Sequence, residues 1–249
     1  MFVRDPLRRL FSAYENKFVT INVPYWSGVG RHLVKTFREN PSNKSQACGY
    51  DVAFAEFLSF VISSFEKHFE NVMDSHWKPF DVLCDPCLIK YDIVGKMETF
   101  HDDIQHVLRT IGAGDKIRLP TADTPSLELR RVTINREIEG SFSQFPKLKF
   151  CFSKNEFVVR IVQNFISHGY IEPLDANSIH DLLEIPHGPN IASNLTQLVF
   201  NRMDKSNQTN LLYLPLKTQK AEYANLPKDM LYRLKLVYQN DLVLFGYDY

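Results

Sequence analysis

Apolar residues recur every three or four positions in several parts of the chain, which is the spacing of a helix with one buried face. Near the start, this spacing predicts a helix that follows the end of a short strand at residues 1–3. Its buried face would consist of Leu7, Leu10, Phe11, Tyr14 and Phe18. Asp5 is a suitable N-cap, and Pro6 suits the first helical position, where no N–H is needed.

The segment 51–69 is the clearest helix, with a wide apolar stripe and Asp51 as its expected N-cap. The preceding residues 19–49 are rich in Pro and Gly and predict an irregular loop with a short helical stretch around 30–38. Further along, the pattern predicts a strand over Leu88–Val94, a turn at Gly95 and a helix over about 98–110.

The order of these elements favours an α/β fold, with a parallel sheet flanked by helices in three layers. Near the C-terminus, Pro227 is expected to open a helix. The face of this helix would carry Met230, Leu231, Leu234 and Tyr238. The last apolar run, 241–247, predicts a short strand or an extended tail.

Residues 120–210 have a different texture, polar and rich in turn-forming residues, with little periodicity. Within them, the segment 154–174 resembles a strand or a short helix without clear caps. Because so long a loop is uncommon in a compact domain, we expect an insertion or an appendage to a single domain that spans 1–249.

Composition marks a globular chain: 249 residues, 44% of them hydrophobic, with zero formal net charge. The balance of charge gives no sign of a nucleic-acid partner. No apolar run of 18 residues and no signal peptide are visible. Four cysteines leave the redox compartment open, while three sequons are compatible with a lumenal protein. The sequons begin at Asn43, Asn194 and Asn207.

The start of the first predicted helix is a candidate anion site. Arg4 lies at the strand end, and Arg9 and Ser12 are one helical turn apart. Guanidinium groups, a hydroxyl and the positive end of the helix dipole could bind one oxyanion there. The alternative is an ordinary strand-to-helix turn with solvated arginines.

Other motifs carry weaker signals. His76 could act as a general base, or it could simply be one of 8 histidines without a catalytic role. Cys84 and Cys87 lack the second ligand pair of a zinc site, so we expect no metal, and a disulfide between them or with other cysteines is favoured over redox catalysis. Gly95-Lys96 lacks the other defining residues of a P-loop.

Three segments together resemble the carbohydrate sulfotransferase family, specifically the enzymes like chondroitin 4-sulfotransferase and HNK-1 sulfotransferase. FVRDPLRRLFSAYENKF resembles the family's 3'-phosphate-binding motif. HWKPFDVLCDPCLIKYDIVGKMET and LPKDMLYRLKLVYQNDLVLFGYDY resemble its central block and its C-terminal ending. The resemblance covers roughly residues 1–120 and 215–249 and leaves 120–210 unmatched.

The resemblance implies a P-loop-like sulfotransferase fold and transfer of sulfate from 3'-phosphoadenosine-5'-phosphosulfate to a glycan hydroxyl, with no metal. By position, Arg4 and Ser12 would hold the 3'-phosphate, with Arg9 in support, and His76 would serve as base or acceptor contact. Lys96 and Glu98 match family positions without an assigned task. The implied location is the lumenal side of the Golgi membrane.

The chain also departs from the family pattern. The strand, loop and helix that bind the 5'-phosphosulfate are expected upstream of the Arg-Asp-Pro block, as are the membrane anchor and stem. We therefore expect an N-terminally truncated member with an unusual insert. The alternative is a non-catalytic relic that binds nucleotide or glycan without transfer.

Overall fold

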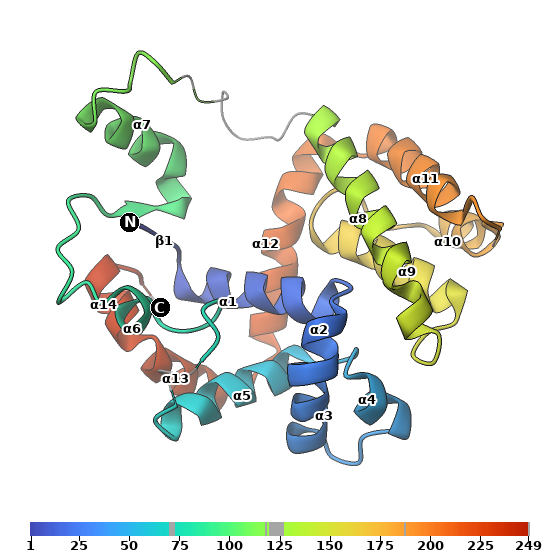
Figure 1. The fold of residues 1–249 in the computed structure, drawn as a ribbon, viewed down its shortest axis with the longest axis horizontal. Coiled ribbons are helices and arrows are strands. Elements are labelled where there is room, and N and C mark those ends of the chain that lie inside the picture. Colours follow the sequence, from blue (N-terminus) through green and yellow to red (C-terminus); the bar gives the residue numbers. More distant parts are fainter. Residues whose placement is uncertain (70–72, 118, 120–126, 187, 249) are drawn as a thin grey trace. The chain divides into compact units, whose positions relative to one another are not determined.

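The computed structural model describes residues 1–69, 73–117, 119, 127–186 and 188–248. Most of their regular structure is helical, and their strands form one two-stranded parallel sheet (Figure 1). Contacts divide the chain into two compact units. Unit 1 comprises residues 1–14, 54–124 and 226–249, and unit 2 comprises residues 15–53 and 125–225. Within the described residues, no helix combines the length and apolar character needed to cross a membrane.

Unit 1 is built around a parallel pair of short strands and several helices. In chain order it contains β1 (Phe2–Val3), α1 (Pro6–Tyr14), α5 (Phe54–Glu66), α6 (Phe80–Cys84), β2 (Gly95–Lys96), η4 (Met97–Thr99), α7 (Phe100–Thr110), α13 (Lys228–Val237) and α14 (Gln239–Phe245). In the sheet, Phe2 is opposite Gly95 and Val3 is opposite Lys96. A Cβ atom at Gly95 would lie 2.5 Å from the Phe2 ring, so a larger residue there would require this ring to move.

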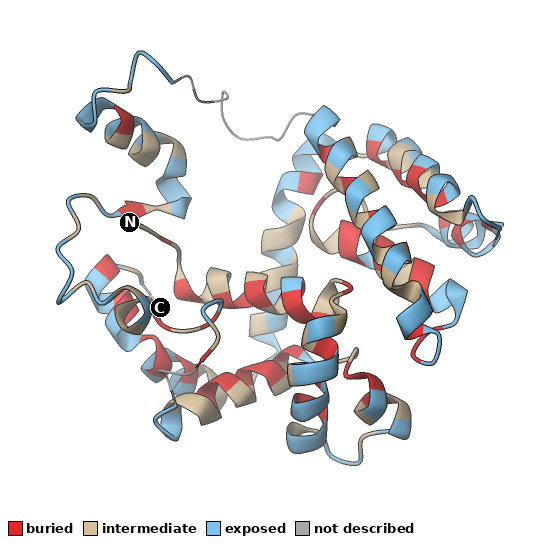
Figure 2. Cartoon of the chain, in the orientation of Figure 1, coloured by how far each residue is buried: buried red, intermediate tan, exposed pale blue. Residues whose placement is uncertain are grey.

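Aromatic side chains fill much of the core of unit 1. The Phe11 and Phe54 rings meet edge to face at 5.3 Å and join α1 to α5. One helical turn further along α5, Phe57 meets the buried Trp77 at the same distance. Figure 2 marks the buried positions along α5 in red. The predicted helices over 51–69 and 227–238 and the strand end at 1–3 are thus confirmed, with shorter bounds.

Two expectations for unit 1 are wrong. Residues 88–94 form turns and irregular backbone, with Leu88 81% exposed, and the strand comes later at β2, where a turn was predicted. The apolar run 241–247 is mostly the helix α14, which ends at Gly246 with φ of 59°. The expected parallel pairing is present, but among the described residues the sheet has only the strands β1 and β2, and three layers are not seen.

The first half of unit 2 is a set of short helices. They are η1 (Glu15–Val19), α2 (Val23–Tyr25), η2 (Trp26–Gly30), α3 (Arg31–Phe37) and α4 (Asn43–Cys48). The backbones of Gly30 and Gly49 approach closely, since a Cβ atom on Gly30 would lie 2.3 Å from the Gly49 oxygen. Asp51 does not cap α5. Its carboxylate instead accepts hydrogen bonds from Arg38 and from the Ser45 hydroxyl.

The second half of unit 2 corrects the expectation of a turn-rich segment. Its helices are α8 (Leu127–Leu148), α9 (Lys154–Ser167), α10 (Ala176–Leu183), α11 (Ile191–Lys205) and α12 (Gln208–Ala224). Helix α9 has a complete capping box between Ser153 and Glu156, although no clear cap was expected. Residues 120–126 and 187, which belong to the same expectation, lie outside the described residues.

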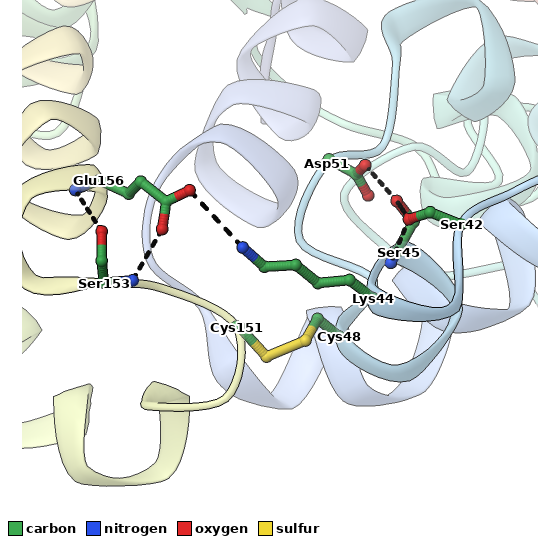
Figure 3. The surroundings of a disulfide bond; sticks show 8 residues. All are labelled: Ser42, Lys44, Ser45, Cys48, Asp51, Cys151, Ser153 and Glu156. Carbon is green, nitrogen blue, oxygen red and sulfur yellow. Dashed lines mark hydrogen bonds and ion pairs between the residues drawn. A yellow bond between two sulfur atoms is a disulfide. The ribbon is translucent and has the colours of Figure 1, made fainter.

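A disulfide joins the two halves of unit 2. Cys48, at the end of α4, is bonded to Cys151, which precedes α9, across 103 positions of sequence. Figure 3 shows Lys44 beside this disulfide, with its ammonium 3.6 Å from the Glu156 carboxylate. The segment 125–225 therefore belongs to the same compact unit as the loop region 15–53 and is covalently attached to it.

Candidate functional site

The turn between β1 and α1 has the local structure that its sequence predicts. The Asp5 carboxylate accepts a hydrogen bond from the Arg8 amide at 2.8 Å, as an N-cap does. Pro6 follows as the first residue of α1, where its missing N–H has no cost. The positive end of the α1 dipole is thus located directly after Arg4.

Two predicted phosphate ligands have unengaged side chains: Arg4, in this turn, and Ser12, within α1. Within the described part of the chain, neither the Arg4 guanidinium nor the Ser12 hydroxyl makes a hydrogen bond or an ion pair. Both residues are only half-buried. An anion could therefore bind these groups without first breaking an internal contact of theirs, although their role as phosphate ligands stays a prediction.

Arg9 is placed differently, although it belongs to the same helix. Its guanidinium donates to the backbone oxygen of Lys78 and lies over the Phe80 ring, 3.9 Å from the ring centroid. Its side chain is 13% exposed. Burial lowers the pKa of Arg9 below its ordinary value, against the charge of Asp241 4.0 Å away. Arg9 thus connects α1 to the segment that carries His76.

Asp241 is the buried carboxylate of this region. From α14, its two oxygens accept the backbone amides of Phe80 and Asp81, each at 2.8 Å, and so cap the start of α6. Burial raises the pKa of Asp241, and these hydrogen bonds and Arg9 oppose the rise. Sequence reasoning missed this residue because its partners are backbone groups about 160 positions away.

His76 lies in the exposed segment before α6. Its Nδ1 is 2.6 Å from a carboxylate oxygen of Asp74, which also accepts the His76 amide. Hydrogen bonding to an ionised carboxylate fixes the proton of a neutral imidazole on Nδ1, so the lone pair lies on Nε2. This is the tautomer that a general base needs. Asp74 stands only two positions before His76, so this short spacing is the signal by which the sequence could have indicated the pair.

Lys96 and Glu98 both contact the end of the chain. The Glu98 carboxylate accepts the Asp5 amide and the Tyr247 hydroxyl, each at 3.0 Å. The Lys96 ammonium donates to the Gly246 oxygen at 3.2 Å and lies 4.4 Å from the centroid of the Tyr247 ring. The structure thus gives these two residues partners that the sequence did not indicate.

The cysteines pair otherwise than expected. Cys84 and Cys87 are free thiols, so the disulfides favoured for them are wrong for this structure. Cys48 and Cys151, which looked isolated in sequence, are bonded to each other instead. The backbone explains part of this outcome, since the Cys84 carbonyl accepts the Tyr91 hydroxyl and Asp85 takes a left-handed conformation with φ of 42°.

Comparison with known proteins identifies relatives of this chain. Human carbohydrate sulfotransferase 9 is 39% identical over 120 residues, which are 48% of this chain and 26% of that protein. Zebrafish carbohydrate sulfotransferase 11 is 38% identical over 122 residues, 49% of this chain and 34% of that protein. Mouse carbohydrate sulfotransferase 8 is 36% identical over 150 residues, 60% of this chain and 35% of that protein.

The matched segments therefore span about a quarter to a third of the length of these relatives. No solved structure matches the chain. The model of the sulfotransferase family matches residues 1–148, a range that contains β1, α1, β2 and α8 and ends within the segment 120–210. Since this match covers more than half of the 249 residues, the chain belongs to the sulfotransferase family.

Proposed function

We propose that the protein is a carbohydrate O-sulfotransferase, which moves a sulfuryl group from 3'-phosphoadenosine-5'-phosphosulfate to a glycan hydroxyl. Family membership supports sulfate transfer, and the relatives are carbohydrate sulfotransferases by name. The donor assignment depends on two observations. Among the described residues, Arg4 is unengaged at the positive end of the capped helix α1, and Ser12, further along the same helix, is unengaged as well.

In this proposal, Arg4 and Ser12 bind the 3'-phosphate of the donor. A guanidinium and a phosphate form charge-assisted hydrogen bonds, which are about twice as strong as neutral ones. Arg9 supports the site indirectly, because its guanidinium holds α1 to the backbone of Lys78. The parallel pair β1–β2 would belong to a larger sheet of the P-loop-like sulfotransferase fold.

The reaction is an in-line displacement at sulfur. The acceptor hydroxyl oxygen forms a bond to sulfur while the bond from sulfur to the 5'-phosphate oxygen breaks, and adenosine 3',5'-bisphosphate leaves with the bonding electron pair. His76 takes the hydroxyl proton on Nε2, and Asp74 stabilises the imidazolium through Nδ1. Cationic donors around the leaving phosphate stabilise the charge that develops there.

The acceptor is a glycan of the chondroitin type or a related sugar, and the location is the Golgi lumen, with membrane attachment through a segment outside this chain. The disulfide between Cys48 and Cys151 supports a lumenal location, since such bonds persist in oxidising compartments. The zero formal net charge fits a partner other than nucleic acid.

Replacing Arg4 tests the donor site. We expect Arg4→Ala to weaken binding of adenosine 3',5'-bisphosphate by about 10- to 100-fold, because a hydrogen bond to a charged group contributes about 1.5–3 kcal/mol. Isothermal calorimetry measures the affinity, and transfer of labelled sulfate to chondroitin measures the activity of the full-length protein. Arg109→Ala, at an exposed arginine of α7, is the matched control.

The outcomes separate the hypotheses. Equal affinity and equal turnover in Arg4→Ala and wild type would remove Arg4 from the donor site. Nucleotide binding without transfer by the full-length protein would favour the non-catalytic relic. Failure of the wild type to bind the nucleotide would contradict both.

A further inference from the structure

The two strands of the sheet bring two chain segments to the same place. Because β1 and β2 are parallel, the residues that follow them leave the sheet at the same end. Arg4 and Asp5 follow β1, and η4 with Glu98 follows β2. Ligands of parallel sheets bind beyond the carboxyl ends of the strands. Glu98 therefore lies at the same end of the sheet as Arg4, and it contacts the residue that follows Arg4.

Glu98 completes the cap of α1 from outside the helix. In a capping box, the third helical residue is an acidic or amide side chain that accepts the amide of the N-cap residue. The third residue of α1 is Arg8, which cannot accept a hydrogen bond. Glu98 takes that role and accepts the Asp5 amide at 3.0 Å. The first turn of α1 can thus carry a cation and still be fully capped.

Tyr247 and Lys96 extend this arrangement to the end of the chain. The second oxygen of Glu98 accepts the Tyr247 hydroxyl, and the Tyr247 ring lies against the Lys96 ammonium. Lys96 also donates to the Gly246 oxygen, and its own amide donates to Asp103 at 2.7 Å. The segment after α14 thus contacts β2 twice, through Lys96, and η4 once, through Glu98, whose other oxygen accepts the Asp5 amide.

The charges in this cluster are arranged consistently. Burial would raise the pKa of Glu98, but hydrogen bonds from Asp5 and Tyr247 and the charge of Arg8 lower it overall, so Glu98 is a carboxylate. Burial and the hydrogen bond to Glu98 raise the pKa of Tyr247, so Tyr247 keeps its proton and donates it. The cation whose charge acts on Glu98 is Arg8, in the first turn of α1.

We propose that Glu98 and Tyr247 are positioning residues for the 3'-phosphate of the donor, and that Lys96 keeps Tyr247 in place. This inference rests on the proposed function. The two residues do not touch the nucleotide. They fix the direction in which the backbone leaves β1. This in turn fixes the position of the Arg4 backbone from which its side chain extends. An arginine that must meet one phosphate on a ribose ring needs such a fixed origin.

The test compares two nucleotides of equal charge, adenosine 3',5'-bisphosphate and adenosine 2',5'-bisphosphate. Calorimetry on the intact chain gives the affinity for each isomer, and the ratio reports how strictly the phosphate position is read. We expect Tyr247→Phe, which removes only the hydroxyl, to lower the preference for the 3' isomer roughly tenfold. Glu98→Ala should do the same, and Glu98→Gln should restore most of it, because its amide oxygen can still accept the Asp5 amide.

Tyr232→Phe is the matched control, since Tyr232 is an exposed tyrosine of α13 and should keep the wild-type ratio. A merely structural role would lower the melting temperature and leave the ratio of the two affinities unchanged, which would overturn the proposal. If Arg4→Ala abolishes the preference and Tyr247→Phe keeps it, the proposed donor site stands and the positioning role fails. If the wild type shows no preference, both fail.

Discussion

Arg9 joins separate parts of unit 1 through a single guanidinium. From α1 it reaches the Lys78 carbonyl, the Phe80 ring and the neighbourhood of Asp241. Such a group serves packing, hydrogen bonding and charge compensation at once. Replacing Arg9 should therefore lower the free energy of unfolding, whatever its effect on donor binding.

We predict that Arg9→Ala lowers the free energy of unfolding of unit 1 by about 3 kcal/mol, because the Asp241 carboxylate would stay buried without its cation. The free energy of unfolding of Arg9→Lys should lie between those of the wild type and Arg9→Ala, since lysine keeps the charge but loses the flat stacking on Phe80. Urea unfolding followed by circular dichroism measures both. An unchanged midpoint in Arg9→Ala, beside an unchanged Arg109→Ala control, would contradict the prediction.

At the residue scale, the sequence predicted local partners better than distant ones. The cap formed by Asp5 and the place of Pro6 depend on neighbouring residues and are confirmed. Arg9 and Glu98 bind backbone groups 69 and 93 positions away, and a backbone acceptor or donor leaves no mark in the sequence. Their partners could only be found from the fold.

At the element scale, an ion pair links α5 to α13. Both Glu66 oxygens accept from the Arg233 guanidinium, at 2.8 and 2.7 Å. The hydrogen bond lowers the pKa of Glu66. The pair therefore contributes stability that is present above the unfolded-state pKa, about 4.3, and is lost as the pH falls through the lower folded-state value.

We predict that Arg233→Ala destabilises the protein most at neutral pH and that its difference from wild type vanishes in acid. The pair is exposed, so the difference at pH 7 should be small. Urea unfolding over a pH series from 7 to about 3 checks the sign. Lys228→Ala, at an exposed lysine of the same helix, serves as control, and a difference that grew in acid would refute the assignment.

Short apolar runs were the main source of error among the elements. Residues 88–94 have strand-forming side chains, but a strand needs a partner, and this segment turns at Asp85 instead, where the amides of Leu88 and Ile89 bond to its carbonyl. The run 241–247 has too few residues for its period to separate helix from strand. In contrast, the long stripe of α5 was unambiguous.

Helices in the segment 127–224 were hidden by their composition. Helix α8 buries residues at a spacing of four, Arg130, Ile134 and Ile138, but it also carries exposed Leu129 and Val132, which blur the pattern. Helices α8 and α12 contain Pro146 and Pro215, and proline inside a helix is unfavourable because it removes a backbone hydrogen bond. Packing of α8 against α9 and α11 overrides these local preferences.

At the scale of the whole molecule, the disulfide between Cys48 and Cys151 should set the stability of unit 2. Closing a loop of about 100 residues removes chain entropy from the unfolded state. We predict that the double variant Cys48→Ser/Cys151→Ser loses about 2–5 kcal/mol in unit 2. Four cysteines allow several different pairs, so the sequence alone left this bond undetermined.

The two tryptophans allow this loss to be located. Trp26 belongs to unit 2 and Trp77 to unit 1, and both are buried. In variants that retain only one of them, fluorescence should report an earlier unfolding at Trp26 and an unchanged transition at Trp77. Cys87→Ser, which removes an exposed free thiol, is the control. Equal shifts at both tryptophans would contradict a disulfide effect confined to unit 2.

The position of the cysteines along the chain has a consequence for biosynthesis. Cys48 is made 103 residues before Cys151, and Cys84 and Cys87 emerge from the ribosome between them. In the oxidising compartment of the proposed function, Cys48 can react with Cys84 or Cys87 before Cys151 has been synthesised. A disulfide formed in this way must be exchanged before Cys48 can bond to Cys151. Replacing both Cys84 and Cys87 should therefore raise the yield of correctly bonded protein, although neither takes part in the disulfide of the final fold.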